Sequence, residues 1–233
     1  MTIVRHCLRV TNATGLSAFY RDLLGMSRFG TAETPLFGYD ENQCLLEFRK
    51  GDVTPYAAGA NDLYWKIGIT LRDLDHAVAF LKREDWPVSE PRQFRDIGYM
   101  AHLSDPEGFA IELLQQGFEG NAEAAGDGHP IGGQATLAHI TLRITDLPAA
   151  RELCENKLGM RLMSIQPVQE RNFSLYFYAW SDEPLPNPDL EAVENREWLW
   201  ARPYALLELQ HLQEEGATIR KPEAGAAGFT EIG

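Results

Sequence analysis

Hydrophobic and polar positions follow one order in three segments of the chain, residues 5–26, 66–88 and 139–160. Each segment opens with apolar and polar residues in alternation, which predicts a β-strand with one buried face. Each continues with apolar residues at helical spacing, such as Leu16 and Phe19 in the first segment. The three segments align without gaps. We therefore predict a strand–helix unit that occurs three times.

Further β-type segments follow each predicted helix, and the last is an apolar strand that carries a single glutamate. These glutamates are Glu47 in CLLEF, Glu112 in FAIELL and Glu208 in YALLELQ. The pattern predicts an α+β fold of tandem βαβββ units, with mixed sheets and with the helices on the outside.

A change in composition divides the repeats into two predicted domains. Residues 118–134 are rich in Gly, Ala and acidic residues and lack a hydrophobic period, which is typical of a linker. The first domain then covers residues 1–117 and contains two units, 1–52 and 62–117. The second domain covers residues 135–233.

The second predicted domain contains one whole unit, which a long loop interrupts at residues 181–203. Two of its tryptophans, Trp198 and Trp200, have the spacing of neighbours on one strand face. They line a ligand cavity, or they belong to the core or to a dimer contact. The last residues, 228–233, read as the opening strand of a fourth unit that is truncated or absent.

The strand faces predict where the chemistry lies. At the start of the third unit His139, Thr141 and Arg143 share a polar face, and the apolar residues between them face the helix. Polar faces that line a curved sheet form a natural cavity. The glutamates of the last strands are flanked by apolar residues, so each should be paired, hydrogen-bonded or metal-bound. An imidazole beside two carboxylates suits Zn²⁺, Ni²⁺, Mn²⁺ or Fe²⁺, whereas an internal salt bridge is the alternative.

The units resemble those of the vicinal-oxygen-chelate superfamily, which includes glyoxalases, bleomycin-resistance proteins and extradiol dioxygenases. The resemblance is carried by FYRDLLGM at 19–26, DPEGFAIEL at 105–113 and the segment at 139–160. The third unit is most similar to the glyoxalase I (lactoylglutathione lyase) branch. The resemblance implies that paired units form a U-shaped sheet around a divalent metal.

The resemblance also implies which residues hold that metal. The ligands come from the first residue of a unit's first strand and from the glutamate of its last strand, which are His139, Glu208 and Glu112 here. Glu208 or Glu112 is then the base that moves a proton between neighbouring carbons through an enediolate. The other two units carry Arg5 and Lys66 at the position of His139.

Which units pair decides the donor set, and the sequence leaves this open. Pairing of the first two units would set Arg5 and Lys66 against Glu47 and Glu112, a set that repels a metal and suits a structural role or an anionic ligand. His6 lies one position after Arg5, which holds the place equivalent to His139. Its side chain therefore faces the packing side of the strand, and we expect a structural role for it.

Two other pairings would keep a metal site. Pairing of the second and third units gathers His139, Glu208 and Glu112 together with Lys66, which would have to move aside or be neutral. Pairing of the third unit with a complete fourth unit would gather His139, Glu208 and Glu231.

Substrate-binding residues follow from the same resemblance. Arg143 matches the position that pairs with a substrate carboxylate, although an arginine on a strand also pairs readily with a nearby glutamate. Lys66 and Arg9 are further candidates on the strand faces. Leu212 stands where the glyoxalase I branch carries an asparagine, which weighs against a glutathione conjugate.

Three functions remain open at this point. The first is a metal-dependent lyase or isomerase of glyoxalase type that acts on a small oxygenated substrate. The second is an extradiol dioxygenase, which needs two histidines and one carboxylate, whereas the first-strand positions supply only His139. The third is a small-ligand-binding protein that has lost its metal.

Charge and cysteine content limit the classes of partner and the cellular location that we expect. The 34 acidic residues exceed the 21 basic ones and give a net charge of -13, which disfavours nucleic acid and anionic membranes as partners. The N-terminal residues lack a signal peptide's apolar stretch, and three cysteines without a CxxC motif suggest reduced thiols. We expect a cytoplasmic protein with a small-molecule substrate. Open sheet edges predict a homodimer, which light scattering would test.

Overall fold

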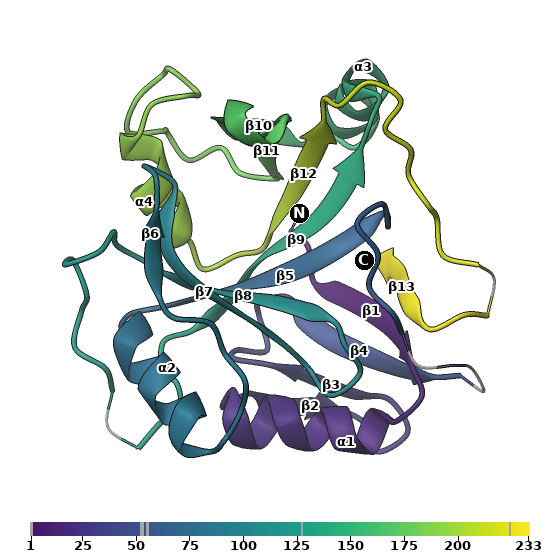
Figure 1. Ribbon diagram of the computed structural model, residues 1–233, viewed down its shortest axis with the longest axis vertical. Helices are drawn as coiled ribbons and strands as arrows, with labels where there is room; N and C mark the ends of the chain where they lie inside the picture. Colours follow the sequence, from purple (N-terminus) through teal and green to yellow (C-terminus); the bar gives the residue numbers. More distant parts are fainter. Residues whose placement is uncertain (1, 52–53, 55, 127, 224) are drawn as a thin grey trace.

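Two sheets organise the molecule in the computed structural model, which describes residues 2–51, 54, 56–126, 128–223 and 225–233. One sheet has eight strands in the order β10-β11-β12-β9-β5-β8-β7-β6, and the other has five in the order β13-β1-β4-β3-β2. Figure 1 shows the helices at the periphery of both sheets. The predicted α+β fold with mixed sheets is confirmed.

The eight-stranded sheet joins the second and third units. The second unit supplies β5 (Tyr64–Leu71), β6 (Arg92–Phe94), β7 (Gly98–Ser104) and β8 (Ala110–Gln115). The third unit supplies β9 (Thr136–Ile144), β10 (Arg161–Val168), β11 (Phe173–Ala179) and β12 (Leu206–Leu212). The first strands, β5 and β9, run antiparallel at the centre, and each also pairs in parallel with the last strand of its own unit. The sheet therefore crosses the predicted linker, and the two domain boundaries stay a prediction.

The five-stranded sheet holds the first unit and the end of the chain. Its strands are β1 (Arg5–Val10), β2 (Ser27–Gly30), β3 (Pro35–Gly38), β4 (Leu45–Lys50) and β13 (Gly228–Ile232). β13 runs antiparallel to β1, as β9 does to β5 in the other sheet (Figure 1). The last residues thus pair with β1 as a first strand pairs in the other sheet, and their assignment to a fourth unit stays a prediction.

Each unit's helix begins at a side-chain cap. Asn12, Asp73 and Asp146 each accept a hydrogen bond from a backbone N–H of the first turn. The helices are α1 (Ala13–Ala18), α2 (Leu74–Arg83) and α3 (Leu147–Arg151), and π-helical turns at Phe19–Leu23 and Glu152–Lys157 extend the first and third. Gly25 and Gly159 follow these turns with φ of 70° and 65°, the left-handed conformation expected of a residue that ends a helix.

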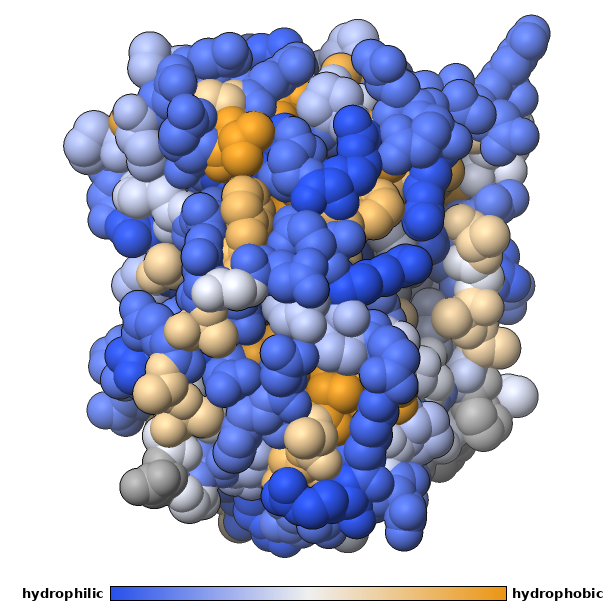
Figure 2. Space-filling model, turned by 60° about the vertical axis from the view of Figure 1, so that its left-hand side comes forward, coloured by the Kyte–Doolittle hydropathy of each residue, from blue (hydrophilic) through white to orange (hydrophobic). Residues whose placement is uncertain are grey.

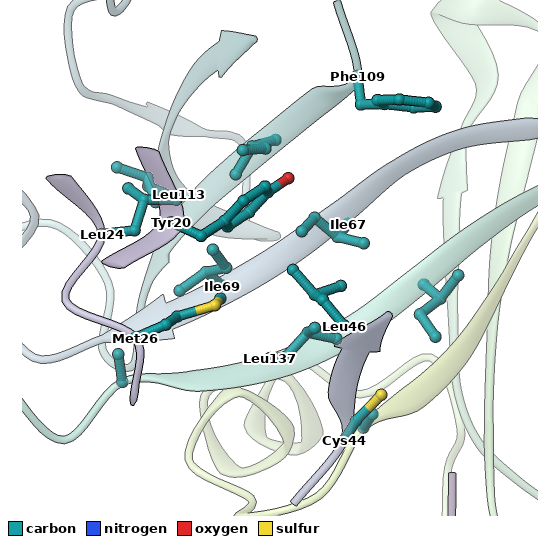
Figure 3. Close-up of a cluster of buried hydrophobic side chains, with 14 of the residues drawn as sticks. Tyr20, Leu24, Met26, Cys44, Leu46, Ile67, Ile69, Phe109, Leu113 and Leu137 are labelled. Carbon is teal, nitrogen blue, oxygen red and sulfur yellow. The ribbon is translucent and has the colours of Figure 1, made fainter. Parts of the chain in front are cut away.

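The larger of two hydrophobic clusters among the described residues extends across both sheets. Tyr20 and Leu46 of the first unit, Ile67 of the second and Leu137 of the third belong to the same buried cluster (Figure 3). The face shown in Figure 2 is mostly hydrophilic, with hydrophobic residues in small separate patches. Within the part of the chain that the structure describes, no helix is long and apolar enough to cross a membrane.

The long loop at 181–203 contains a helix, α4 (Glu194–Trp200), where the spacing of the tryptophans indicated a strand. The reason is that Arg196, Leu199 and Trp200 are buried together, at intervals that place them on one helix face. Trp200 donates a hydrogen bond through its indole to the carbonyl of Ile97 at 2.9 Å. α4 thereby closes one end of the cavity described next.

Candidate functional site

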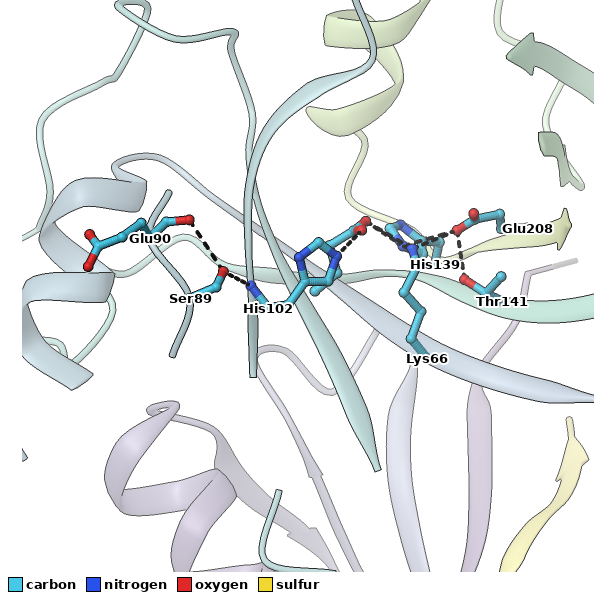
Figure 4. A network of polar contacts seen from close by, with 8 residues as sticks. Lys66, Ser89, Glu90, His102, His139, Thr141 and Glu208 are labelled. Carbon is cyan, nitrogen blue, oxygen red and sulfur yellow. Dashed lines mark hydrogen bonds and ion pairs between the residues drawn. The ribbon is translucent and has the colours of Figure 1, made fainter. Parts of the chain in front are cut away.

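Four side chains that the sequence singled out meet inside the eight-stranded sheet. The Lys66 Nζ lies 2.9 Å from Glu112 Oε1, 3.1 Å from His139 Nε2 and 3.2 Å from Glu208 Oε2 (Figure 4). Strand register brings them together, because Gly68 of β5 faces both His139 and Glu112 on its two sides. We call Lys66, Glu112, His139 and Glu208 the central cluster.

The central cluster is almost fully buried, and its charges depend on each other. Burial by itself lowers the pKa of Lys66, but the carboxylates of Glu112 and Glu208 outweigh it and raise the pKa above its ordinary value. Burial alone would raise the pKa of Glu112, yet the Lys66 ammonium and the hydrogen bond of His102 hold it well below its ordinary value. Lys66 is therefore an ammonium and Glu112 a carboxylate.

His139 is held by packing rather than by a hydrogen bond on its far side. Its ring meets Phe177 and Trp200 with centroid distances of 6.2 and 6.1 Å. A Cβ at Gly68 would come within 1.9 Å of the ring, so the missing side chain makes room for the imidazole. His139 Nδ1 is buried and has no hydrogen-bond partner among the described residues.

Glu208 has one occupied and one unpartnered oxygen. Thr141 donates a hydrogen bond to Oε2 at 2.7 Å, and Lys66 donates to the same oxygen. Oε1 is buried and has no partner in the part of the chain that the structure describes. A buried carboxylate oxygen without a donor needs an explanation, and a ligand's donor is one.

His102 is a site residue that the sequence reading missed. Its Nε2 lies 3.0 Å from Glu112 Oε2, and 41% of its side chain is exposed. Its backbone N–H donates a hydrogen bond to Ser89 Oγ at 2.9 Å (Figure 4). The sequence contained a signal for His102, because the turn at 106–108 sets a hairpin register in which His102 lies opposite Glu112.

A pocket opens above the central cluster. Its empty volume is about 570 Å³, open mouth included, and its polar lining comes from the central cluster, His102, Arg92 and Arg171. The rest of its lining is apolar and comes from both units of the sheet and from α4. It includes Trp65, Phe94, Phe173, Leu175, Phe177 and Trp200. Such a pocket suits a small molecule with an apolar body and one polar end.

Two predicted substrate-binding residues lie elsewhere. Arg143 does not line the pocket: it donates to Gln210 Oε1 at 3.0 Å and to the carbonyls of Gly59 and Asp62, and its guanidinium stacks on Trp65. These hydrogen bonds use the Arg143 guanidinium to link neighbouring segments of the chain, so it is not free to bind a substrate. Arg9 belongs to β1 in the other sheet, where it donates to the carbonyl of Ala226.

The equivalent position in the five-stranded sheet is a salt-bridge network. Glu47 pairs with Arg5 at 3.2 Å and with Arg49 at 2.6 Å, and Arg49 also pairs with Glu231 at 2.6 Å. The two cations and two anions neutralise each other. This network is partly exposed, unlike the central cluster.

Comparison with known protein families finds a match for the first half of the chain. The sequence model of the Glyoxalase/Bleomycin resistance protein/Dioxygenase superfamily matches residues 2–113. Residues 2–113 belong to this superfamily. No curated protein matches the chain.

Solved structures extend the likeness in fold to the whole chain. Glyoxalase I from Zea mays is 16% identical, with a TM-score of 0.67 over 99% of this chain and 73% of its own. Two variants of the maize enzyme are also similar: one at 17% identity, with the same TM-score and coverage, and one at 18%, with a TM-score of 0.64 over 93% of this chain and 70% of its own. At these identities the likeness shows the glyoxalase I fold.

Proteins of this superfamily typically use a divalent metal, and the central cluster contains suitable donor types. Their arrangement does not fit such a cation, because the Lys66 ammonium occupies the point that Glu112, His139 and Glu208 share. His139 Nδ1 also lacks the oxygen partner that orients metal-bound imidazoles. Among the described residues, no group of three or more His, Cys, Asp or Glu side chains has a metal-holding arrangement.

Proposed function

We propose that the chain binds a small oxygenated molecule with an apolar body and moves a proton on it, as a lyase or isomerase of glyoxalase type. The apolar walls of the pocket would hold the body of the substrate. The central cluster would meet its oxygen-bearing end. The superfamily membership of residues 2–113 and the fold of glyoxalase I agree with this chemistry.

The observation that carries the proposal is the unpartnered Oε1 of Glu208. It is a buried acceptor in a residue that lines the pocket, so a proton donor on a bound molecule would complete its hydrogen bonding. In the proposed reaction the same oxygen acts as the base. Thr141 and Lys66 both bind Oε2, which holds the carboxylate in one orientation.

The proposed reaction is a proton transfer next to a carbonyl group. Glu208 takes the proton from the carbon, and the electron pair of that C–H bond moves onto the carbonyl oxygen. The Lys66 ammonium stabilises the negative charge that develops there. Glu208 then returns the proton to the former carbonyl carbon. The proton of the substrate's own α-hydroxyl group moves to the enolate oxygen, and the oxygen that loses it becomes the new carbonyl, so the substrate is isomerised with no net change in charge.

An exchange experiment tests this proposal. 2-Hydroxyacetophenone combines an aromatic body with an α-hydroxycarbonyl, and its methylene protons exchange in D₂O when a base removes them. We expect the protein to accelerate their loss in ¹H NMR spectra, and Glu208→Gln to lower the accelerated rate by roughly 100-fold or more. Glu47→Gln changes the equivalent glutamate of the five-stranded sheet and should leave the rate unchanged. Equal rates for Glu208→Gln and the wild type would refute the role of Glu208.

A second candidate is binding without turnover. It is favoured by Lys66, whose Nζ makes three contacts within the cluster and has no hydrogen left for a ligand without a rearrangement. Saturation-transfer NMR with the same ketone distinguishes the two functions. Binding without any methylene exchange would support the second candidate.

A further inference from the structure

The Lys66 amine contacts three groups at once, which is more than an ordinary ion pair. An ammonium has three hydrogens, and the three acceptors of the central cluster lie 2.9 to 3.2 Å from Nζ. Two are carboxylates and one is an imidazole nitrogen. A single cation is thus held by the donor types that bind divalent metals.

We propose that the Lys66 ammonium is a built-in cation that takes the place of a metal ion in this pocket. Its charge offsets the buried carboxylates of Glu112 and Glu208, which would otherwise repel each other. Lys66 itself is 2% exposed, and its amine lies 4.8 Å from the centroid of the Trp65 ring. A divalent cation would have to displace this side chain from the centre of the cluster.

The proposal predicts that one substitution converts the site. In Lys66→Ala the ammonium and its stem are absent, and His139, Glu112 and Glu208 surround an open space in which they can move toward a bound cation. Three metal-type donors with two negative charges should then bind Zn²⁺. Lys66→Met fills nearly the same space without charge and is the matched control, because it removes the cation but leaves no room for a metal.

Calorimetric titration of EDTA-treated protein with ZnCl₂ measures the effect. We expect Lys66→Ala to bind one equivalent of Zn²⁺ that the double variant Lys66→Ala/His139→Ala does not bind. The wild type and Lys66→Met should lack this equivalent. Co²⁺ gives a second readout, because its absorption spectrum reports the ligands around it.

Two results would overturn the proposal. One is an equivalent of Zn²⁺ on the wild type that His139→Ala removes. The other is a folded Lys66→Ala protein that gains no metal. If Lys66→Ala does not fold, the comparison of the wild type with His139→Ala still decides, because a metal-free wild type supports the built-in cation. These readouts measure metal binding, so they are independent of the proton transfer proposed above.

Discussion

At the scale of single residues, Asp105 shows how a buried carboxylate supports the site from a distance. Its Oδ1 accepts the backbone N–H groups of Glu107 and Phe109, and Tyr20 donates its hydroxyl to Oδ2 at 3.0 Å. These bonds shape the turn between β7 and β8. This turn sets the register that places His102 opposite Glu112.

Asp105 should make stability depend on pH. Burial raises its pKa to about 6 from 3.8, although the hydrogen bonds of Phe109, Glu107 and Tyr20 oppose the shift. A raised pKa means that the folded protein binds the proton more tightly. The stabilisation is then complete below about pH 4 and is lost as pH rises through 6, by about 3 kcal/mol in total.

Asp105→Asn tests this expectation, because it removes the titrating group and keeps an acceptor for the backbone. Urea unfolding at several pH values between 4 and 7 gives the free energy of unfolding for both proteins. We expect the wild type to lose stability relative to Asp105→Asn as pH rises across this range. A constant difference between the two proteins would contradict the raised pKa.

At the scale of elements, the contact between β5 and β9 decides the shape of the central cluster. Gly68 of β5 lies opposite His139 of β9, and the imidazole occupies the space that a side chain at position 68 would fill. Phe177 and Trp200 confine the ring on its other sides. The glycine is therefore required by packing, and its own φ lies outside the left-handed region.

Gly68→Ala should destabilise the protein by about 1–3 kcal/mol, the usual cost of forcing extra atoms into a packed core. The cause is the overlap of the new Cβ with the His139 ring. Adding His139→Ala removes the overlapping ring, so the two substitutions should cost less together than the sum of their separate effects. The free energy of unfolding in urea measures all three variants. Additive effects would show that the ring and the glycine do not interact as described.

At the scale of the whole molecule, the two sheets depend on one another. The buried ring of His6, from β1, packs against both Tyr64 of β5 and Phe229 of β13, with centroid distances of 5.3 and 5.8 Å. Burial lowers the pKa of His6 to about 3, so the ring stays neutral and serves as a packing residue. This matches the structural role expected from its strand face. The predicted homodimer and cytoplasmic location stay predictions.

The shared core predicts a single unfolding transition. All five tryptophans lie between residues 65 and 200, whereas the buried thiols of Cys7 and Cys44 belong to the five-stranded sheet and its approach. In a Cys154→Ala background, thiol labelling therefore reports on the first unit and fluorescence on the other two. We expect both signals to change at the same urea concentration. Separate midpoints would mean that the first unit unfolds on its own.

Much of this molecule was determined by local sequence. Alternation and helical spacing predicted the repeated units. The polar face of residues 139–143 singled out His139, and the family resemblance implied Glu208, from the last strand of the same unit, as its partner. The sequence also predicted Lys66 and Glu112 in that set, on the condition that the second and third units pair.

Only the tertiary structure decided that condition, because each unit offers a similar edge to its neighbours and local pattern does not distinguish them. It also decided the directions of long side chains. Arg143 turns to backbone carbonyls and Trp65 instead of the pocket, and the Lys66 amine stays in the centre of the cluster. A flexible side chain goes where the surrounding charges and acceptors stabilise it most, and those neighbours come from strands far apart in the sequence.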